Sequence, residues 1–225
     1  MLKRDDFLSD IYLIDWMKHE GKLDTESIDK DLKSNFNRID FEVPSTEFKT
    51  IKYLLDRGCY ISSSKVTYAY KNTIPTVTAD PRLDLATMGD AQELSRLAAE
   101  TFTLDRYRND PYLDAKLVPK LYSEWIKNSL NGRSDKVIVH RENAAILGFT
   151  NTIKKTEELY IDLVGVRKNC EGRGIGKSLI SKVKELYPQE TLSCTTQIHN
   201  VPMQRVLQRA GFGIVSSSYI FTAVR

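Results

Sequence analysis

The chain has 225 residues, of which 41% are hydrophobic and 28% charged, and its formal net charge is +3. This length allows one large domain or two small ones, with enough apolar side chains for a core. So small a net charge does not indicate a nucleic-acid partner. No apolar run reaches the roughly 18 residues that a membrane-spanning helix needs. We therefore expect a soluble protein without a nucleic-acid or membrane partner.

The N-terminus and the cysteines both favour the cytoplasm. Residues 1–6 lack the apolar stretch and the cleavage site of a signal peptide. Cys59, Cys170 and Cys194 are odd in number and far apart, without the spacing of a metal site. We predict reduced thiols in a cytoplasmic protein that binds no metal.

The first third of the chain predicts a unit of its own. Residues 5–20 mix apolar and charged side chains without a clean period. Residues 48–57 have the spacing of a short helix, and residues 60–70 alternate as a strand does. Residues 72–81 contain two prolines and several threonines, which is typical of a linker. The sequence therefore predicts a small partial α/β domain over residues 1–80.

Part of this segment is similar to a later part of the chain. Residues 54–64 and residues 206–218 both have the pattern of a helix that ends at a glycine and leads into a strand. Two explanations stay open. One is an internal duplication, and the other is the ordinary likeness of helix–glycine–strand joints.

The rest of the chain predicts alternating strands and helices. Asp90 is expected to cap a helix that runs to Phe102. A strand at 159–166 leads into a helix at 174–187, and a hairpin turns around Glu142. The other predicted elements are strands at 83–88, 136–140, 145–153, 192–198 and 213–224 and helices at 115–130 and 201–209.

The segment after the strand at 159–166 carries most of the functional information. Val164, Gly165 and Val166 lead into a glycine-rich run at 171–177, where an amphipathic helix begins. Glycines let the backbone adopt a positive φ and approach a ligand closely. A helix start offers unpaired N–H groups and a partial positive charge. The segment therefore predicts a site for phosphate or pyrophosphate.

The spacing of the glycines excludes two common phosphate loops. Gly172 lies four positions before Gly176, one too few for a Walker loop. The order Gly-x-Gly-x-Gly is not the Rossmann pattern, and no acidic residue follows at the distance of a ribose partner. A bare strand-to-helix turn stays open, because such a turn uses the same residue types.

The segment resembles the acyl-CoA loop of the GNAT acyltransferase family. Val166, Glu171, Gly174 and Gly176 fall in register with that loop, although Glu171 stands where arginine or glutamine is usual. The order of predicted elements from residue 83 onward is also similar to this family. The resemblance implies an α/β GNAT fold at residues 81–225, with a mixed central sheet splayed at the CoA site. It also implies that residues 1–80 are a small partial GNAT-like domain.

The resemblance implies a coenzyme A site built mostly from backbone. The backbone of Val164 and Val166 would pair with the pantetheine arm, and one amide would polarise the thioester carbonyl. The amides of residues 173–177 would hold the pyrophosphate, with the side chains of Arg173 and Lys177 adding charge. The expected CoA-binding residues are Val164, Gly165, Val166, Glu171, Gly172, Arg173, Gly174, Ile175, Gly176, Lys177 and Asn200, the last of which also suits a helix cap.

The residue that moves the proton is not evident. Many GNAT enzymes carry a tyrosine where this chain has Leu207, which cannot titrate. His199 follows a strand end and is the candidate catalytic base, with a loop histidine of no special role as the alternative. Tyr219 and Cys194 are other candidates, each with a structural alternative. Asp162 matters only if it faces the cleft, and a route through water stays open.

The expected acceptor site combines arginines with aromatic rings. Such residues suit an anionic ligand that carries a ring, and a charged surface loop is the alternative. Residues 101–112, 122–128 and 196–200 resemble the GNAT enzymes that acetylate dTDP-fucosamine (dTDP-4-amino-4,6-dideoxygalactose). The resemblance implies transfer of acetyl, or a longer acyl group, to the amine of a dTDP-linked amino-dideoxyhexose, in O-antigen, lipopolysaccharide or other surface polysaccharide synthesis. The predicted sugar-binding residues are Arg106, Tyr107, Arg108, Tyr112, Trp125 and Gln197.

Two other functions stay open. A GNAT enzyme that acts on a protein N-terminus or a small amine would have an acidic cleft, whereas residues 101–112 contain Arg106 and Arg108. A catalytically silent CoA-binding module is suggested by Leu207 and Glu171. A homodimer is also compatible with the sequence.

Overall fold

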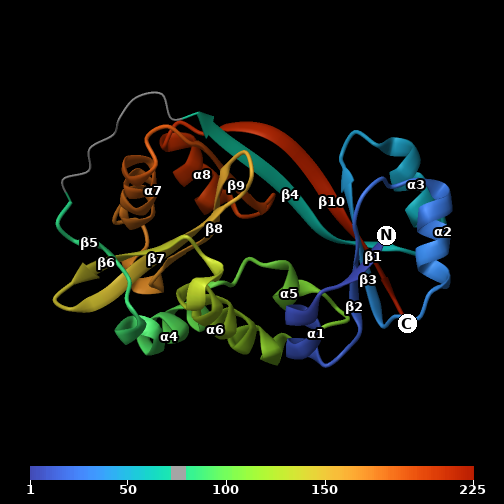
Figure 1. The fold of residues 1–225 in the computed structure, drawn as a ribbon, viewed down its shortest axis with the longest axis horizontal. Coiled ribbons are helices and arrows are strands. Elements are labelled where there is room, and N and C mark those ends of the chain that lie inside the picture. The colour runs from blue at the N-terminus through green and yellow to red at the C-terminus, as the bar shows by residue number, and fades with distance from the viewer. Residues whose placement is uncertain (72–79) are drawn as a thin grey trace. The chain divides into compact units, whose positions relative to one another are not determined.

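The computed structural model describes residues 1–71 and 80–225 (Figure 1). Most of the predicted linker at 72–81 therefore lies outside the described residues. The chain divides into two compact units. The first unit comprises Met1–Val66, Leu104–Leu117 and Ser216–Arg225, and the second comprises Thr67–Thr103 and Val118–Val215. The predicted division into residues 1–80 and 81–225 stays a prediction.

The strands of the first unit form a mixed sheet in the order β1-β2-β3-β10-β4. β2 pairs with β1 antiparallel and with β3 parallel, and β3 pairs with β10 antiparallel. β4 confirms the strand predicted at 60–70. The strands are β1 (Leu2–Arg4), β2 (Trp16–His19), β3 (Arg38–Pro44), β4 (Tyr60–Lys71) and β10 (Gly213–Val224).

Short helices accompany this sheet: α1 (Asp6–Tyr12), α2 (Thr25–Lys33), α3 (Phe48–Asp56) and α5 (Arg106–Asn109). Three of them begin after an aspartate, Asp5, Asp24 or Asp105, whose side chain accepts a hydrogen bond from a backbone N–H of the first turn. Such a cap satisfies one of the unpaired N–H groups at a helix start. α3 confirms the helix predicted at 48–57.

β3 has an apolar face and a charged face, and both are buried. Ile39, Phe41 and Val43 are fully buried in a core with residues of α2 and α3. Arg38 and Asp40 alternate with them, yet they are only 1% and 4% exposed. Because buried charges are costly unless they are paired, these two residues require partners.

The second unit holds the glycine-rich loop. Its strands lie in the order β4-β9-β8-β7-β6-β5. Neighbours from β5 to β8 are antiparallel, and β8 pairs with β9 in parallel. The strands not yet named are β5 (Leu83–Leu85), β6 (Lys136–Glu142), β7 (Ala145–Lys154), β8 (Leu159–Val166) and β9 (Thr191–Gln197).

Two helix pairs cover the two faces of this sheet (Figure 1). α4 (Ala91–Thr101) and α6 (Val118–Asn128) lie side by side on one face. α7 (Ile175–Leu186) and α8 (Val201–Arg209) lie on the other. Among the described residues, no helix combines the length and the apolar character needed to cross a membrane.

Most predicted elements are confirmed to within a few residues, and two differ. The strand predicted at 83–88 ends at Leu85, because a 3₁₀ turn begins at Met88. The helix predicted at 115–130 is split into a 3₁₀ turn, α6 and a π-helical turn (Ser129–Arg133). Asp90 is the N-cap residue of α4, as predicted, but its side chain makes no cap hydrogen bond. Its side chain accepts hydrogen bonds from Thr87 and Arg141 instead.

Candidate functional site

β8 and β9 separate part-way along their length. Their parallel pairing covers only Leu159 to Ile161 on β8 and Leu192 to Cys194 on β9. β8 continues to Val166 and β9 to Gln197. Beyond the last pair, the edge of β8 that faces β9 has no strand partner among the described residues. The splay that the sequence predicted is therefore present, and an extended ligand can pair with such an edge.

A β-bulge lies where β8 and β9 separate, and the gap between the two strands is called the opening below. The register of β7 against β8 shifts between Asn151 and Thr152, and Asp162 is the extra residue on β8. The side chain of Asn151 fills the bulge. Its Oδ1 accepts from the N–H of Leu163 at 3.0 Å, and its Nδ2 donates to Asp162 at 3.0 Å. A bulge bends its strand, so this one directs β8 where the pairing with β9 ends.

Asp162 is a structural anchor in this unit. Its carboxylate accepts hydrogen bonds from Trp125 Nε1 at 2.9 Å and from Arg133 at 2.7 Å, besides the one from Asn151. Its side chain is 7% exposed. Trp125 also stacks on Tyr122, with ring centroids 5.9 Å apart. Asp162 thus ties the end of the α6 region to β8, and the sugar-binding role of Trp125 stays a prediction.

Two glycines allow close packing beneath the loop. A Cβ on Gly165 would lie 2.6 Å from the ring of Phe149 on β7. A Cβ on Gly148 would lie 2.7 Å from the side chain of Ile175, the first residue of α7. Because real Cβ contacts are longer than this, both positions require glycine. The contact at Gly148 brings the start of α7 close to the sheet, and the contact at Gly165 packs β8 against a side chain of β7.

The glycine-rich loop presents an open backbone. Gly172 and Gly174 have φ values of 78° and 83°, and a Cβ at either position would meet nothing within 4 Å. Positive φ is therefore the reason for glycine here. α7 has no side-chain cap, and the N–H of Ser178, bonded to the carbonyl of Gly174 at 3.0 Å, belongs to its first closed turn. The N–H groups before Ser178 are those that a helix start offers to an anion.

The two cationic side chains of the loop differ in whether they already have an ion-pair partner. Lys177 is exposed on the first turn of α7 and has no ion-pair partner among the described residues. Arg173 instead donates to both carboxylate oxygens of Glu142, at 2.6 and 2.9 Å. The hydrogen bond from Arg173 holds the pKa of Glu142 below its ordinary value. One cation is thus available to an anionic ligand, while the other is already paired.

The turn after β9 carries two of the predicted site residues, His199 and Asn200. Asn200 accepts a hydrogen bond from the N–H of Met203 at 3.3 Å, which confirms it as the cap of α8. Its own N–H bonds to the carbonyl of Gln197 at 2.9 Å. His199 is exposed in this turn. These residues follow the strand that forms the second wall of the opening.

The candidates for proton donor have buried surroundings. Leu207 is fully buried. Cys194 lies opposite Ile161 in the last β8–β9 pair, and burial raises the pKa of its thiol to about 12. Tyr219 packs against the apolar core of the first unit. Within the described part of the chain, no group of three or more His, Cys, Asp or Glu residues could hold a metal ion.

The predicted sugar-binding arginines belong to the first unit, where Arg106 is engaged in its interior. Its Nη2 lies 2.8 Å from the carboxylate of Asp40, and its side chain is 10% exposed. Tyr107 is 9% exposed, and its ring lies 6.1 Å from that of Trp16. Arg38 completes the buried group through Asp110, at 2.6 Å. The charged face of β3 is therefore paired.

Arg108 and Tyr112, the other two predicted sugar-binding residues of the first unit, are more exposed than Tyr107. Arg108 is half-buried, and its Nε has no hydrogen-bond partner among the described residues. Tyr112 is 62% exposed, and its ring centroid lies 5.0 Å from that of Tyr60. Contact with a sugar nucleotide stays a prediction for all four residues, and these two are the better placed for it.

Comparison with known proteins gives the family. A family model described as "Acetyltransferase (GNAT) family" matches residues 92–212, which is more than half of the chain. The chain belongs to the GNAT acetyltransferase family. The match includes the β8 opening, the glycine-rich loop and α8. Members of this family take acyl groups from coenzyme A thioesters, which agrees with the resemblance seen in the sequence.

One curated relative has a more specific name. The chain is 32% identical over 136 residues to the "Spore coat polysaccharide biosynthesis protein SpsD" of Bacillus subtilis (strain 168). The match covers 59% of this chain and 47% of that protein. The chain thus spans about half the length of this relative.

Solved structures support the fold. A protein of unknown function from Staphylococcus epidermidis has a TM-score of 0.71 at 14% identity, covering 97% of this chain and 88% of that one. A GCN5-related N-acetyltransferase from Sphaerobacter thermophilus has a TM-score of 0.62 at 15% identity, covering 83% and 59%. A tandem GNAT protein from the clavulanic acid pathway has a TM-score of 0.60 at 14% identity, covering 93% and 75%. At these identities, the likeness concerns the fold alone.

Two residues of the site were missed from the sequence. Asn151 is a fully buried polar residue between two buried threonines, Thr150 and Thr152, and no local pattern in the sequence marks it. Glu142 had been placed only in a hairpin turn. Its contact with Arg173, 31 positions away, has no local signature.

Proposed function

We propose that this protein transfers an acyl group from acyl-CoA to the amine of a nucleotide-linked aminosugar, in the synthesis of a surface polysaccharide. The main support for acyl-CoA as the donor is the unpaired edge of β8, which leads directly into the open glycine loop. These residues fit coenzyme A. The strand edge suits an extended arm with amide groups, and the helix start suits a pyrophosphate.

The roles of the residues follow from this fit. The backbone of Val164 and Val166 pairs with the pantetheine arm, and one amide donates to the thioester carbonyl, where negative charge develops. The amides of residues 173–177 hold the pyrophosphate, and Lys177 adds charge. Asn200, whose side chain already caps α8, contributes a further hydrogen bond to the arm.

The transfer is a direct attack with no covalent enzyme intermediate. The amine forms a bond to the thioester carbonyl carbon, and the carbon–sulfur bond then breaks to release the thiolate. Holding the two reactants together supplies much of the rate enhancement. His199 takes the proton of the amine, directly or through water. Leu207 takes no part in proton transfer, since it is apolar and fully buried.

The acceptor is supported by independent observations. The curated relative is named for spore coat polysaccharide biosynthesis, which favours an acceptor that is a sugar. Arg108 and Tyr112 offer a cation and an exposed ring, the chemistry that suits a nucleotide. We therefore propose a dTDP-linked amino-dideoxyhexose such as dTDP-fucosamine, acylated on its amine by acetyl or a longer acyl group.

A second candidate function is a CoA-binding module without catalysis. Leu207 favours it, since the side chain at that position can donate no proton. In this case the opening and the loop would bind acyl-CoA, and no acyl group would move.

A steady-state assay of free thiol separates these functions. With acetyl-CoA and a dTDP-aminosugar, we expect thiol release that depends on both substrates. If thiol is released with small amines or peptides and not with aminosugars, the acceptor is a small amine or a peptide instead. CoA binding without thiol release from a panel of acyl-CoAs and nucleotide aminosugars would leave the silent module as the function.

A further inference from the structure

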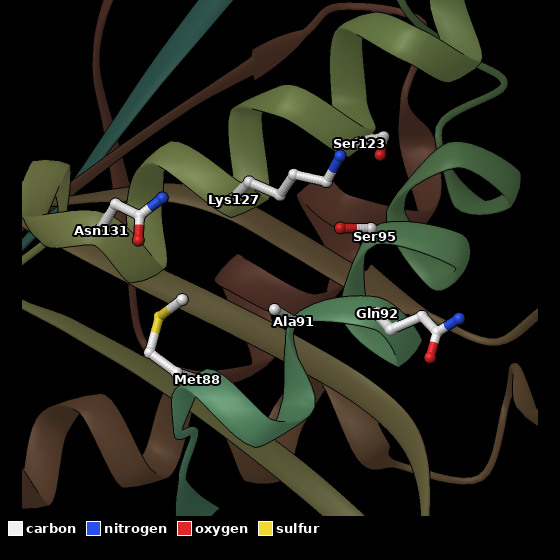
Figure 2. Close-up of a pocket in the computed structure, with 7 residues that line it drawn as sticks. All are labelled: Met88, Ala91, Gln92, Ser95, Ser123, Lys127 and Asn131. Carbon is white, nitrogen blue, oxygen red and sulfur yellow. The ribbon is translucent and has the colours of Figure 1, made fainter.

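A hollow between α4 and α6 in the second unit is separate from the acyl-CoA site. Its volume is about 410 Å³, within the range of roughly 300–1,000 Å³ that is usual for small-molecule pockets. Figure 2 shows the lining residues on the two helices, with the strands of the sheet behind them. None of them belongs to the β8 edge or the glycine loop. The lining residues are Met88, Ala91, Gln92, Ser95, Ser123, Lys127 and Asn131.

A buried hydroxyl without a partner lies in this hollow. Ser95 is 7% exposed, and its Oγ has no hydrogen-bond partner among the described residues. Leaving a buried hydroxyl unsatisfied costs stability, so such a group usually meets a ligand or water. Figure 2 shows the hydroxyl directed into the space between the two helices.

Other uncharged polar groups share the hollow. The side chains of Gln92, Ser123 and Asn131 line it, and within the described residues none of the three has a hydrogen-bond partner. Together with Ser95 they provide two hydroxyls and two amides, groups that both donate and accept. The hollow is therefore prepared for several hydrogen bonds to one ligand.

The hollow has little net charge. Lys127 is its one ionised lining residue, and its Nζ donates to Glu124 at 2.7 Å. A phosphate would thus find a cation that is already paired. No aromatic side chain is among the lining residues, so a nucleobase would have no ring to stack on. Most of the accessible surface of the hollow is apolar, and Met88 and Ala91 contribute to it.

We propose that this hollow binds a neutral saccharide ring. Such a ring carries several hydroxyls, which both donate and accept, around apolar C–H faces. That combination matches the two hydroxyls, the two amides and the apolar surface of Met88 and Ala91. The inference rests on these residues alone and does not depend on the acyl-transfer reaction.

A nuclear magnetic resonance titration of the full chain tests this proposal. Methyl glycosides of glucose, galactose, mannose and N-acetylglucosamine are added to ¹⁵N-labelled protein, with inorganic phosphate and AMP in parallel. We expect saturable shifts at the amides of Ser95, Ser123 and Asn131 with at least one glycoside. Saturation of the same amides by phosphate or AMP and by no glycoside would overturn the proposal, as would the absence of saturable shifts with any glycoside.

Ser95→Ala distinguishes ligand binding from a structural role. Because the Oγ of Ser95 has no hydrogen-bond partner in the described part of the chain, its replacement should leave the unfolding midpoint in urea unchanged or raise it. The affinity for the glycoside should fall about 3- to 10-fold, the effect of one hydrogen bond. Gln92→Ala should give a similar loss, and Gln208→Ala on the exposed face of α8 serves as its matched control. Unchanged glycoside affinity in both Ser95→Ala and Gln92→Ala would contradict the proposal.

Discussion

The guanidinium of Arg106 lies 2.8 Å from the carboxylate of Asp40, and both side chains are almost completely buried. Burial works against the charge on Asp40, but Arg106 and Arg38 outweigh it and hold its pKa below its usual value. The pair joins α5 to β3, which are 66 positions apart in the chain. An arginine that the sequence had suggested for substrate binding is therefore also a structural contact of the first unit.

Replacing Arg106 by alanine should destabilise the protein. Breaking a buried ion pair leaves one charge without its partner and typically costs about 3–5 kcal/mol. We expect about 3 kcal/mol in urea unfolding, the lower end of that range, because Arg38 still faces Asp40. Since the folded-state pKa of Asp40 is lowered, this contribution is complete above its unfolded pKa of about 3.9 and is lost as the pH falls through the lowered value.

Lys52→Ala is the control for this variant. Lys52 pairs with Asp56 at 2.6 Å on the surface of α3, with side chains 76% and 54% exposed. An exposed pair of this kind contributes about 0.3–0.5 kcal/mol. Equal, small losses of stability in both variants would show that Arg106 is not a structural residue. Arg106 would then again be a candidate for binding the acceptor.

Arg108→Ala should act on the acceptor. Arg108 is half-buried as a whole residue, and its buried Nε has no hydrogen-bond partner among the described residues. Under the proposed function, we expect the KM for the sugar nucleotide to rise about tenfold, the effect of one charge-assisted hydrogen bond. The KM for acyl-CoA should not change. Arg96→Ala, at an exposed position of α4, is the matched control. A parallel rise of both KM values would argue against this assignment.

Local patterns predicted the secondary structure well, and the family resemblance implied the splayed sheet. Long-range pairing was beyond both. β8, α8 and β10 have the predicted bounds, since each has a clear period and a glycine or asparagine at its start or end. Arg106 was predicted to bind the sugar nucleotide, because nothing near it in the sequence indicates its buried partner Asp40. Arg173 was assigned to the pyrophosphate, because nothing near it in the sequence indicates Glu142.

Glu142→Gln should strengthen CoA binding. The carboxylate of Glu142 holds Arg173, which stands beside the amides of the helix start. Removing that charge frees Arg173 for the pyrophosphate, so we expect the Kd for CoA to fall about 2- to 5-fold in calorimetry at low salt. Because Arg173 lowers the pKa of Glu142, the carboxylate stays charged across the neutral range, and this difference should be constant from about pH 6 to 8.

The matched control for Glu142 is Glu158, which lies immediately before β8. Glu158→Gln removes a carboxylate that pairs with Lys155 at 2.9 Å, away from the loop, and should leave the Kd unchanged. Weaker CoA binding in Glu142→Gln would mean that Glu142 positions Arg173 for the ligand and does not compete with it.

Gly174→Ala should weaken CoA binding through the backbone. A left-handed conformation costs about 1 kcal/mol more for alanine than for glycine, and the loop at φ 83° would relax away from it. Gly21→Ala is a close control, because Gly21 has φ 94° and is equally free of neighbours within 4 Å. Both variants should lose similar stability in urea, while only Gly174→Ala raises the Kd for CoA. Equal CoA affinities would indicate that the loop does not contact the ligand.

Asn151→Ala should disturb the opening from within the sheet. The variant removes the acceptor of the Leu163 N–H and a donor to Asp162, both in a buried strand pair. One unsatisfied buried group costs about 1–3 kcal/mol, so urea unfolding should show a loss of that size. The bulge would also lose its side-chain support, so we expect a higher KM for acyl-CoA. Asn128→Ala, at the exposed end of α6, should change neither quantity. A loss of stability with an unchanged KM would show that the bulge does not set the geometry of the β8 edge.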